Sequence, residues 1–149
     1  MDEHIKVFEK DLGTWDAEIE VRPQPGTEVQ RSRGVTVNRL VGGRWLVGDY
    51  KNETTGFEGH GVYGWDAAKQ RYVGTWVDSM RSAMILTEGT WDAATRTMTF
   101  VGEMQHGGQT LRWRDITQTV EPGHQLFRTL MADGQGGEWE MMKVDSRRR

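Results

Sequence analysis

The chain has no cysteine and only three prolines among its 149 residues. Without thiols there is no disulfide framework, no cysteine nucleophile, no zinc ribbon and no iron–sulfur cluster. No apolar run approaches the length of about 18 residues typical of a membrane span. The opening stretch MDEHIKVFEKDLG is charged at every second or third position, unlike the apolar centre of a secretory signal. We therefore expect a soluble, cytoplasmic protein.

The sequence also lacks a strong excess of charge and the short motifs of the large enzyme classes. Its formal net charge is −3, with both signs interspersed, which gives no field for steering polyanions. The only basic run is SRRR at 146–149, which we interpret as a solvated tail. There is no Gly-x-Ser-x-Gly and no glycine-rich phosphate loop followed by a helix. We expect neither a nucleic acid nor a membrane as partner.

Tryptophan and glycine are abundant, with seven and 19 copies. Residues 1–12 predict a short helix, because Ile5, Phe8 and Leu12 recur at spacings of three and four and Gly13 follows as a helix C-cap. After it the period becomes two, and apolar residues from Trp15 to Val21 alternate with charged ones. This alternation is typical of a half-buried strand.

Nine further strands are predicted, separated by turn residues at intervals of about ten. We place them at 28–40, 44–52, 57–65, 71–79, 82–91, 97–105, 110–120, 124–132 and 138–146. An open meander of ten strands would expose two edges, and closure removes both. The sequence therefore predicts a single all-β domain over 1–149, a closed up-and-down antiparallel barrel of about ten strands, wide enough for a cavity.

A five-residue segment, GTWDA, occurs at 13–17 and again at 89–93. The related stretches WDAAKQRYVG from Trp65 and WDAATRTMTFVG from Trp91 each place a tryptophan at a strand end, followed by a turn that begins with aspartate. We interpret them as successive hairpins of one meander. An ancient duplication is the alternative.

Several segments resemble known families. Gly13-Thr14-Trp15, after a short helix, resembles the lipocalin and calycin signature. GRWLVGDY at 43–50, GFEGHGVYGWDAAKQRYVGTWVDSM at 56–80 and LRWRDI at 111–116 together resemble the bacterial family catalogued as domain of unknown function 1579. That resemblance implies a lipocalin-like barrel and carries no activity. The chain lacks the secretion signal and cysteines of lipocalins, which argues against an extracellular carrier.

The strand predicted at 71–79 carries the first candidate site. Tyr72, Gly74, Trp76 and Asp78 share one face on strict alternation, although both faces contain apolar residues and either could be inside. With this face inward, Gly74 leaves room for a small flat ligand beside Trp76, and Asp78 accepts a hydrogen bond from it. Alternatively, Asp78 only caps the reversal at 79–80.

Three further residues complete the predicted ligand-binding wall. Trp113 shares a face with Asp115, and the alternative for that strand is a stabilising arginine–aspartate pair. Met84 has a side chain that adapts to irregular cavities, or else simply fills a core. His60 lies between two glycines in a predicted strand. It either contacts the ligand from the barrel wall or is a wall residue without a binding role.

The four histidines show no spacing that places two imidazoles on one face, so we expect no metal site. Haem needs only one histidine in ten-stranded barrels of the nitrobindin type. His60 and His124 are the conceivable ligands. The alternative for His60 is a residue of the barrel wall without a ligand, and the alternative for His124 is an exposed turn residue. We expect no cofactor.

These observations predict a lipocalin-like barrel, monomeric or homodimeric, that binds a small, largely apolar or aromatic molecule inside. One alternative is an isomerase or hydrolase in which an aspartate or histidine of the interior acts as general base. Another is an interaction scaffold with a tightly packed interior and an apolar patch outside. We favour a binding protein over an enzyme.

Overall fold

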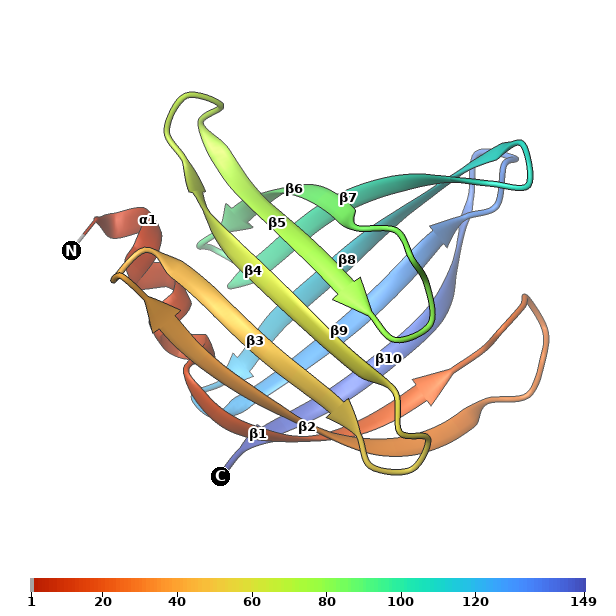
Figure 1. The fold of residues 1–149 in the computed structure, drawn as a ribbon, viewed down its shortest axis with the longest axis horizontal. Helices are drawn as coiled ribbons and strands as arrows, with labels where there is room; N and C mark the ends of the chain where they lie inside the picture. The colour runs from red at the N-terminus through yellow and green to blue at the C-terminus, as the bar shows by residue number, and fades with distance from the viewer. Residues whose placement is uncertain (1) are drawn as a thin grey trace.

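The structure is a computed structural model that describes residues 2–149, and ten antiparallel strands dominate it (Figure 1). The strands are β1 (Gly13–Val21), β2 (Gln30–Val41), β3 (Trp45–Asn52), β4 (Glu58–Asp66), β5 (Arg71–Asp78), β6 (Ile85–Asp92), β7 (Thr97–His106), β8 (Gln109–Glu121), β9 (His124–Ala132) and β10 (Glu138–Arg148). They agree with the predicted strands to within three residues at every end.

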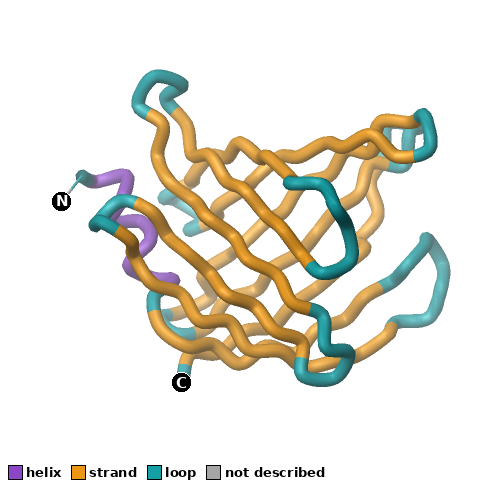
Figure 2. Tube along the Cα trace, viewed as in Figure 1, coloured by secondary structure: helices purple, strands orange, loops and turns teal. Residues whose placement is uncertain are grey.

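The strands form a closed barrel in which each one pairs with its neighbours in the chain. Closure is made by β1, which pairs with β2 on one side and with β10 on the other. The predicted all-β, up-and-down, ten-stranded barrel is therefore confirmed. Figure 2 shows the short helical segment at one end, and hairpin loops at both. Among residues 2–149 no helix is long and apolar enough to cross a membrane.

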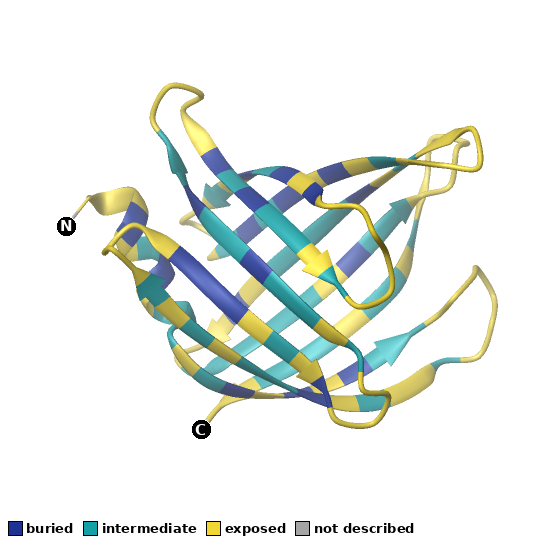
Figure 3. Ribbon diagram, in the orientation of Figure 1, coloured by how far each residue is buried: buried dark blue, intermediate teal, exposed yellow. Residues whose placement is uncertain are grey.

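The alternation of β1 sets the inside of the barrel. Trp15, Ala17 and Ile19 are 3%, 4% and 3% exposed, whereas Asp16 and Glu18 between them are exposed. Because directly paired residues of neighbouring strands point to the same face, this assignment passes from strand to strand around the barrel. Figure 3 shows the resulting bands of buried and exposed positions along the strands.

The N-terminal segment closes one end of the barrel. It consists of α1 (Glu3–Lys6) and a 3₁₀ turn, η1 (Val7–Asp11). Ile5 and Phe8 are buried in one cluster with inward residues of β3, β5 and β7, and the Phe8 ring packs edge-on against Tyr72 at 5.5 Å. Burial of two apolar side chains thus fixes a helix too short to be stable alone.

Hydrogen bonds tie the end of this segment to the barrel. The carbonyl oxygen of Asp11 accepts from the indole of Trp15 at 2.9 Å and from the amide of Asn38 at 2.8 Å. The helix was predicted over residues 1–12 with Gly13 as its cap. The first of these, Met1, lies outside the described residues, the helical segment ends at Asp11, and Gly13, at φ 107°, instead begins β1.

The two related segments that begin with tryptophan and aspartate, at Trp65 and Trp91, form equivalent hairpins. Asp66 accepts from the backbone N–H of Ala68 at 2.9 Å, and Asp92 accepts from that of Ala94 at 3.0 Å. Gln70 and Arg96, at the same place in each repeat, have φ of 54° and 53°. The same turn is therefore used twice, as the sequence indicates.

The C-terminal arginines are part of the barrel rather than a loose tail. β10 continues to Arg148, whose guanidinium lies 5.2 Å from the ring of Trp15. Arg149 donates to both carboxylate oxygens of Asp16 at 3.0–3.2 Å. This differs from the solvated tail expected for 146–149, because the register with β1 supplies partners for these side chains.

Candidate functional site

The candidate site lies on the inner wall of the barrel, toward the end far from the helix. We call that end, which carries the turns at 22–29, 53–57, 79–84, 107–108 and 133–137, the mouth. Register places Trp76 and Asp78 of β5 on the inner face, through their pairing with Gly61 and Gly59 of β4. The sequence left open which face of this strand is inside, and the paired strands decide it.

Aromatic rings lie flat against this wall because glycines lie beneath them. A Cβ at Gly74 would lie 2.6 Å from the ring of Tyr63, and one at Gly102 would lie 2.6 Å from the ring of Trp113. Real Cβ atoms do not approach so closely, so each ring occupies the space that a side chain would fill. Glycine thus lets large rings cover the wall without projecting straight into the interior.

Three aromatic side chains gather near the mouth. The rings of Tyr50 and Trp76 are 6.5 Å apart, and those of Tyr50 and Phe57 are 5.9 Å apart, both in tilted contact. The hydroxyl of Tyr50 accepts from the amide of the buried Asn52 at 3.2 Å. This cluster offers an apolar surface with one polar edge, a combination suited to flat organic molecules.

Asp78 is held by its neighbours at the top of this cluster. One carboxylate oxygen accepts from the indole of Trp76 at 2.9 Å and the other from the backbone of Met80 at 2.9 Å. The Nε of Arg81 lies 3.4 Å from the first oxygen. Asp78 therefore caps the reversal at 79–80 and also lies on the inner wall beside Trp76, which are the two positions that the sequence analysis described for it.

A second tryptophan–aspartate pair lies on β8. The indole of Trp113 donates to Asp115 at 3.2 Å, and the hydroxyl of Thr129 donates to the other oxygen at 2.7 Å. Burial raises the pKa of the Asp115 carboxyl above its ordinary value, and these two hydrogen bonds oppose the rise. Desolvation raises the pKa of the Tyr63 hydroxyl, and the nearby Asp115 carboxylate raises it further.

The two ends of the barrel differ in how they are closed. Near the helix, Ile5 and Phe8 pack on the buried Leu46, Tyr72, Met98 and Phe100, and Tyr63, Trp65 and Trp91 are half-buried against this cluster. Toward the mouth, most inward side chains keep part of their surface accessible to water, as Tyr50, Trp76, Met104, Met131, Trp139 and Met142 do. The helix end is therefore covered by a segment of the chain, whereas the mouth half presents half-buried aromatic and methionine side chains bordered by turns.

Two of the predicted wall residues lie elsewhere. His60 pairs with Val77 and Asp49 at outward positions, and its Nδ1 lies 2.6 Å from an oxygen of Asp49. Met84 is exposed in the turn at 79–84, at the mouth. The structure thus brings Trp76 and Asp78 together on the inner wall and places Trp113 on the inner face of β8. It leaves His60 outside.

Sequence reasoning missed Tyr50, Phe57, Arg81 and Thr129. A signal existed for Tyr50, because Gly48, Tyr50 and Asn52 alternate as Gly74 and Trp76 do. For Thr129 and Arg81 no local signal exists, since their partners lie on other strands or across a turn.

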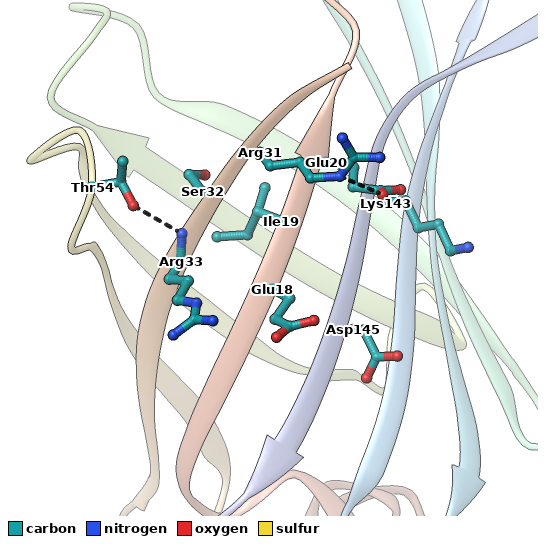
Figure 4. Close-up of a pocket in the computed structure, with 9 residues that line it drawn as sticks. All are labelled: Glu18, Ile19, Glu20, Arg31, Ser32, Arg33, Thr54, Lys143 and Asp145. Carbon is teal, nitrogen blue, oxygen red and sulfur yellow. Dashed lines mark hydrogen bonds and ion pairs between the residues drawn. The ribbon is translucent and has the colours of Figure 1, made fainter.

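A separate hollow of about 510 Å³ lies on β1, β2 and β10 (Figure 4). Its charged lining consists of Glu18, Glu20, Arg31, Arg33, Lys143 and Asp145. These residues occupy outward positions of the three strands, with three charges of each sign. Arg31 and Glu20 form an ion pair at 3.4 Å. A balanced, open, charged surface of this kind does not suit an apolar guest.

Among residues 2–149 no group of three or more His, Asp or Glu side chains is placed to hold a metal ion. His124 takes an outward position on β9, where its Nε2 lies 2.9 Å from Asp145. His60 is outward as well, so neither histidine faces the interior of the barrel.

The model of the family described as "Protein of unknown function (DUF1579)" matches residues 2–148, nearly the whole chain. None of the curated proteins matches the chain.

Proposed function

The chain belongs to the DUF1579 family, and we propose that its barrel binds a small, largely apolar or aromatic molecule against the inner wall of its mouth half. The observation that carries this proposal is the contrast between the two ends of the barrel. The helix end is closed by the N-terminal segment with the buried Ile5 and Phe8, whereas turns border the mouth, where Tyr50 and Trp76 keep accessible surface on the inner wall. Covering such surface stabilises a complex by about 25 cal/mol per Å².

The chemistry of the wall supports an aromatic or apolar guest. Tyr50, Phe57 and Trp76 supply rings, and Met104 and Met131 supply thioethers that adapt to different shapes. Asp78 and Asp115 already accept hydrogen bonds from tryptophan and other neighbours. They therefore leave few free acceptors for a strongly polar guest.

A pair of variants tests whether binding occurs inside. Leu111 faces inward on β8 near the mouth, opposite Met104, and Thr110 is the residue before it, exposed and outward. The variant Leu111→Trp adds bulk to the interior of the mouth half, and Thr110→Trp adds the same side chain outside. Each variant is titrated with N-phenyl-1-naphthylamine, a neutral apolar dye whose fluorescence rises on leaving water.

We expect saturable binding to the wild type and to Thr110→Trp, and at least about tenfold weaker binding to Leu111→Trp, a loss of about 1.4 kcal/mol. Circular dichroism checks that both variants fold. Binding that is equally strong in all three proteins would place the dye outside and contradict the proposal, as would no binding to the wild type.

A second candidate function is an enzyme in which Asp115 acts as general base. It is favoured by the position of this carboxyl on the inner face and by the rise of its pKa through burial. Its test is a ¹³C NMR titration of the Asp115 carboxyl with and without the dye. A guest that shifts this titration lies next to the carboxyl, as a substrate must, and an unchanged titration argues against the enzyme.

The proposal extends to cofactors, partners and location. We propose that the protein works without a cofactor in the cytoplasm, as a monomer or homodimer, with neither nucleic acid nor membrane as partner. The outward positions of His60 and His124 support the proposal that the barrel does not hold haem. A Soret band after addition of hemin would contradict it, and light scattering of the purified protein gives the oligomeric state.

A further inference from the structure

One arginine lies at the mouth with much of its hydrogen-bonding capacity unused. Arg81 belongs to the turn between β5 and β6, and its side chain is 41% exposed. Its Nη1 donates to the sulfur of Met104 at 3.4 Å, and Met104 is an inward residue near the end of β7. The guanidinium therefore reaches from the end of β5 to an inward residue of β7.

The position of Arg81 is fixed from below by Asp78. The Asp78 side chain is 1% exposed and is held by Trp76 and by the backbone of Met80 at 2.9 Å each, independently of the arginine. A buried carboxylate fixed in this way keeps the nearby guanidinium at the mouth.

The partners of Arg81 do not satisfy its donors. A guanidinium has five N–H donors and a thioether is a weak acceptor, so Asp78 and Met104 occupy only part of that capacity. The arginines of β8 differ, because Arg112 and Arg114 donate to carboxylates of Glu103 and Glu138 at 2.7–3.1 Å. Arg81 can thus receive an anion in a way that these arginines cannot.

Apolar side chains surround this charge. Met80 and Met84, in the same turn, are 77% and 64% exposed, and Trp76 lies on the wall below Asp78. Methionines left in water at the mouth gain from being covered by an apolar molecule. The turn thus offers a cation and flexible apolar side chains side by side, which matches the two parts of an amphiphile.

We propose that the guest is an anionic amphiphile whose acidic head group is bound by Arg81 at the mouth, while its apolar body lies against Trp76 and Tyr50. This proposal rests on the proposed function and narrows it. Met84, which sequence analysis placed on the wall, then contacts the guest from the mouth side. The oxygens of a carboxylate or sulfonate accept charge-assisted hydrogen bonds from the free N–H groups of Arg81.

Two dyes with closely similar aromatic bodies test the head-group preference. N-phenyl-1-naphthylamine is neutral, and 8-anilinonaphthalene-1-sulfonate carries one sulfonate. Both are titrated into the wild type, Arg81→Gln and the control Arg44→Gln. Arg44 is exposed in the turn at the helix end, so both variants change the net charge equally.

We expect Arg81→Gln to weaken binding of the sulfonate dye about tenfold or more, and binding of the neutral dye less than about twofold. Arg44→Gln should change neither. The loss should shrink in about 1 M salt, where exposed charges are screened. Unchanged binding of the neutral dye also shows that the variant folds.

The outcomes separate the two proposals. Wild-type binding of the neutral dye, with equal sulfonate binding in Arg81→Gln, would overturn the role of Arg81 and leave the proposed function standing. If Arg44→Gln weakened sulfonate binding as much as Arg81→Gln, net charge would account for the effect and the site would be refuted. Binding of neither dye to the wild type would refute the proposed function itself.

Discussion

Replacing Gly102 by alanine tests the arrangement of rings over glycines. A Cβ at this position would lie 2.6 Å and 2.7 Å from two ring atoms of Trp113, and 3.1 Å from a methyl group of Thr87. The ring must move away from the wall, and overpacking of this kind costs about 1–3 kcal/mol. Its hydrogen bond to Asp115, at 3.2 Å, is weakened by the same movement.

We therefore expect Gly102→Ala to lower the free energy of unfolding by about 2 kcal/mol, and Tm by about 4–8 °C for a chain of this size. The assay is urea unfolding followed by far-ultraviolet circular dichroism. Without a clash, alanine would be neutral or stabilising in a strand, because glycine has the larger backbone entropy when unfolded. The sign of the change is thus informative.

A double-mutant cycle identifies the cause. In a Trp113→Leu background the ring is absent, so Gly102→Ala should cost less than about 0.5 kcal/mol, giving a coupling above about 1 kcal/mol. An equal cost of Gly102→Ala in both backgrounds would refute the view that the ring occupies the space above the glycine.

Three further predictions concern stability. Phe8→Ala should lower the free energy of unfolding by about 3–5 kcal/mol in urea, because Phe8 is buried against Tyr72 where the helix closes the barrel; a loss below about 1 kcal/mol would mean that the helix is not part of the core. Burial raises the folded-state pKa of Asp115, so its contribution to stability is full below its unfolded pKa and is lost as pH rises through the folded pKa. Asp115→Asn should therefore gain stability relative to wild type from about pH 3 to about pH 7, and a constant difference would contradict the raised pKa. Glu138→Gln should cost less than about 1 kcal/mol, and less still in about 1 M salt, since its pair with Arg114 is largely exposed; a larger, salt-independent loss would refute this.

Local patterns in the sequence were enough to predict the barrel. Alternation from Trp15 to Val21, together with turn residues at regular intervals, depends only on neighbours in the chain. The shared face of Trp76 and Asp78 follows from the same period of two. Which face is inside depends on the paired strands, since it is the glycines of β4 that accommodate the ring.

The site was less predictable because it is assembled across strands. His60 lies between Gly59 and Gly61, and those glycines take the inward positions, so the histidine is left outside. Arg81 contacts the inner wall through Met104, which is 23 residues away in the chain. No local pattern encodes such a contact, which arises from the register of the closed barrel.

The indole N–H signals of the tryptophans test most directly whether the guest binds inside. Trp76 lies on the inner wall near the mouth, whereas Trp45 lies at an outward position over Gly64. In a ¹H–¹⁵N spectrum, with signals assigned through Trp45→Phe and Trp76→Phe, addition of N-phenyl-1-naphthylamine should shift the Trp76 signal and leave that of Trp45 in place. A shift of Trp45 with Trp76 unmoved would contradict binding inside the barrel.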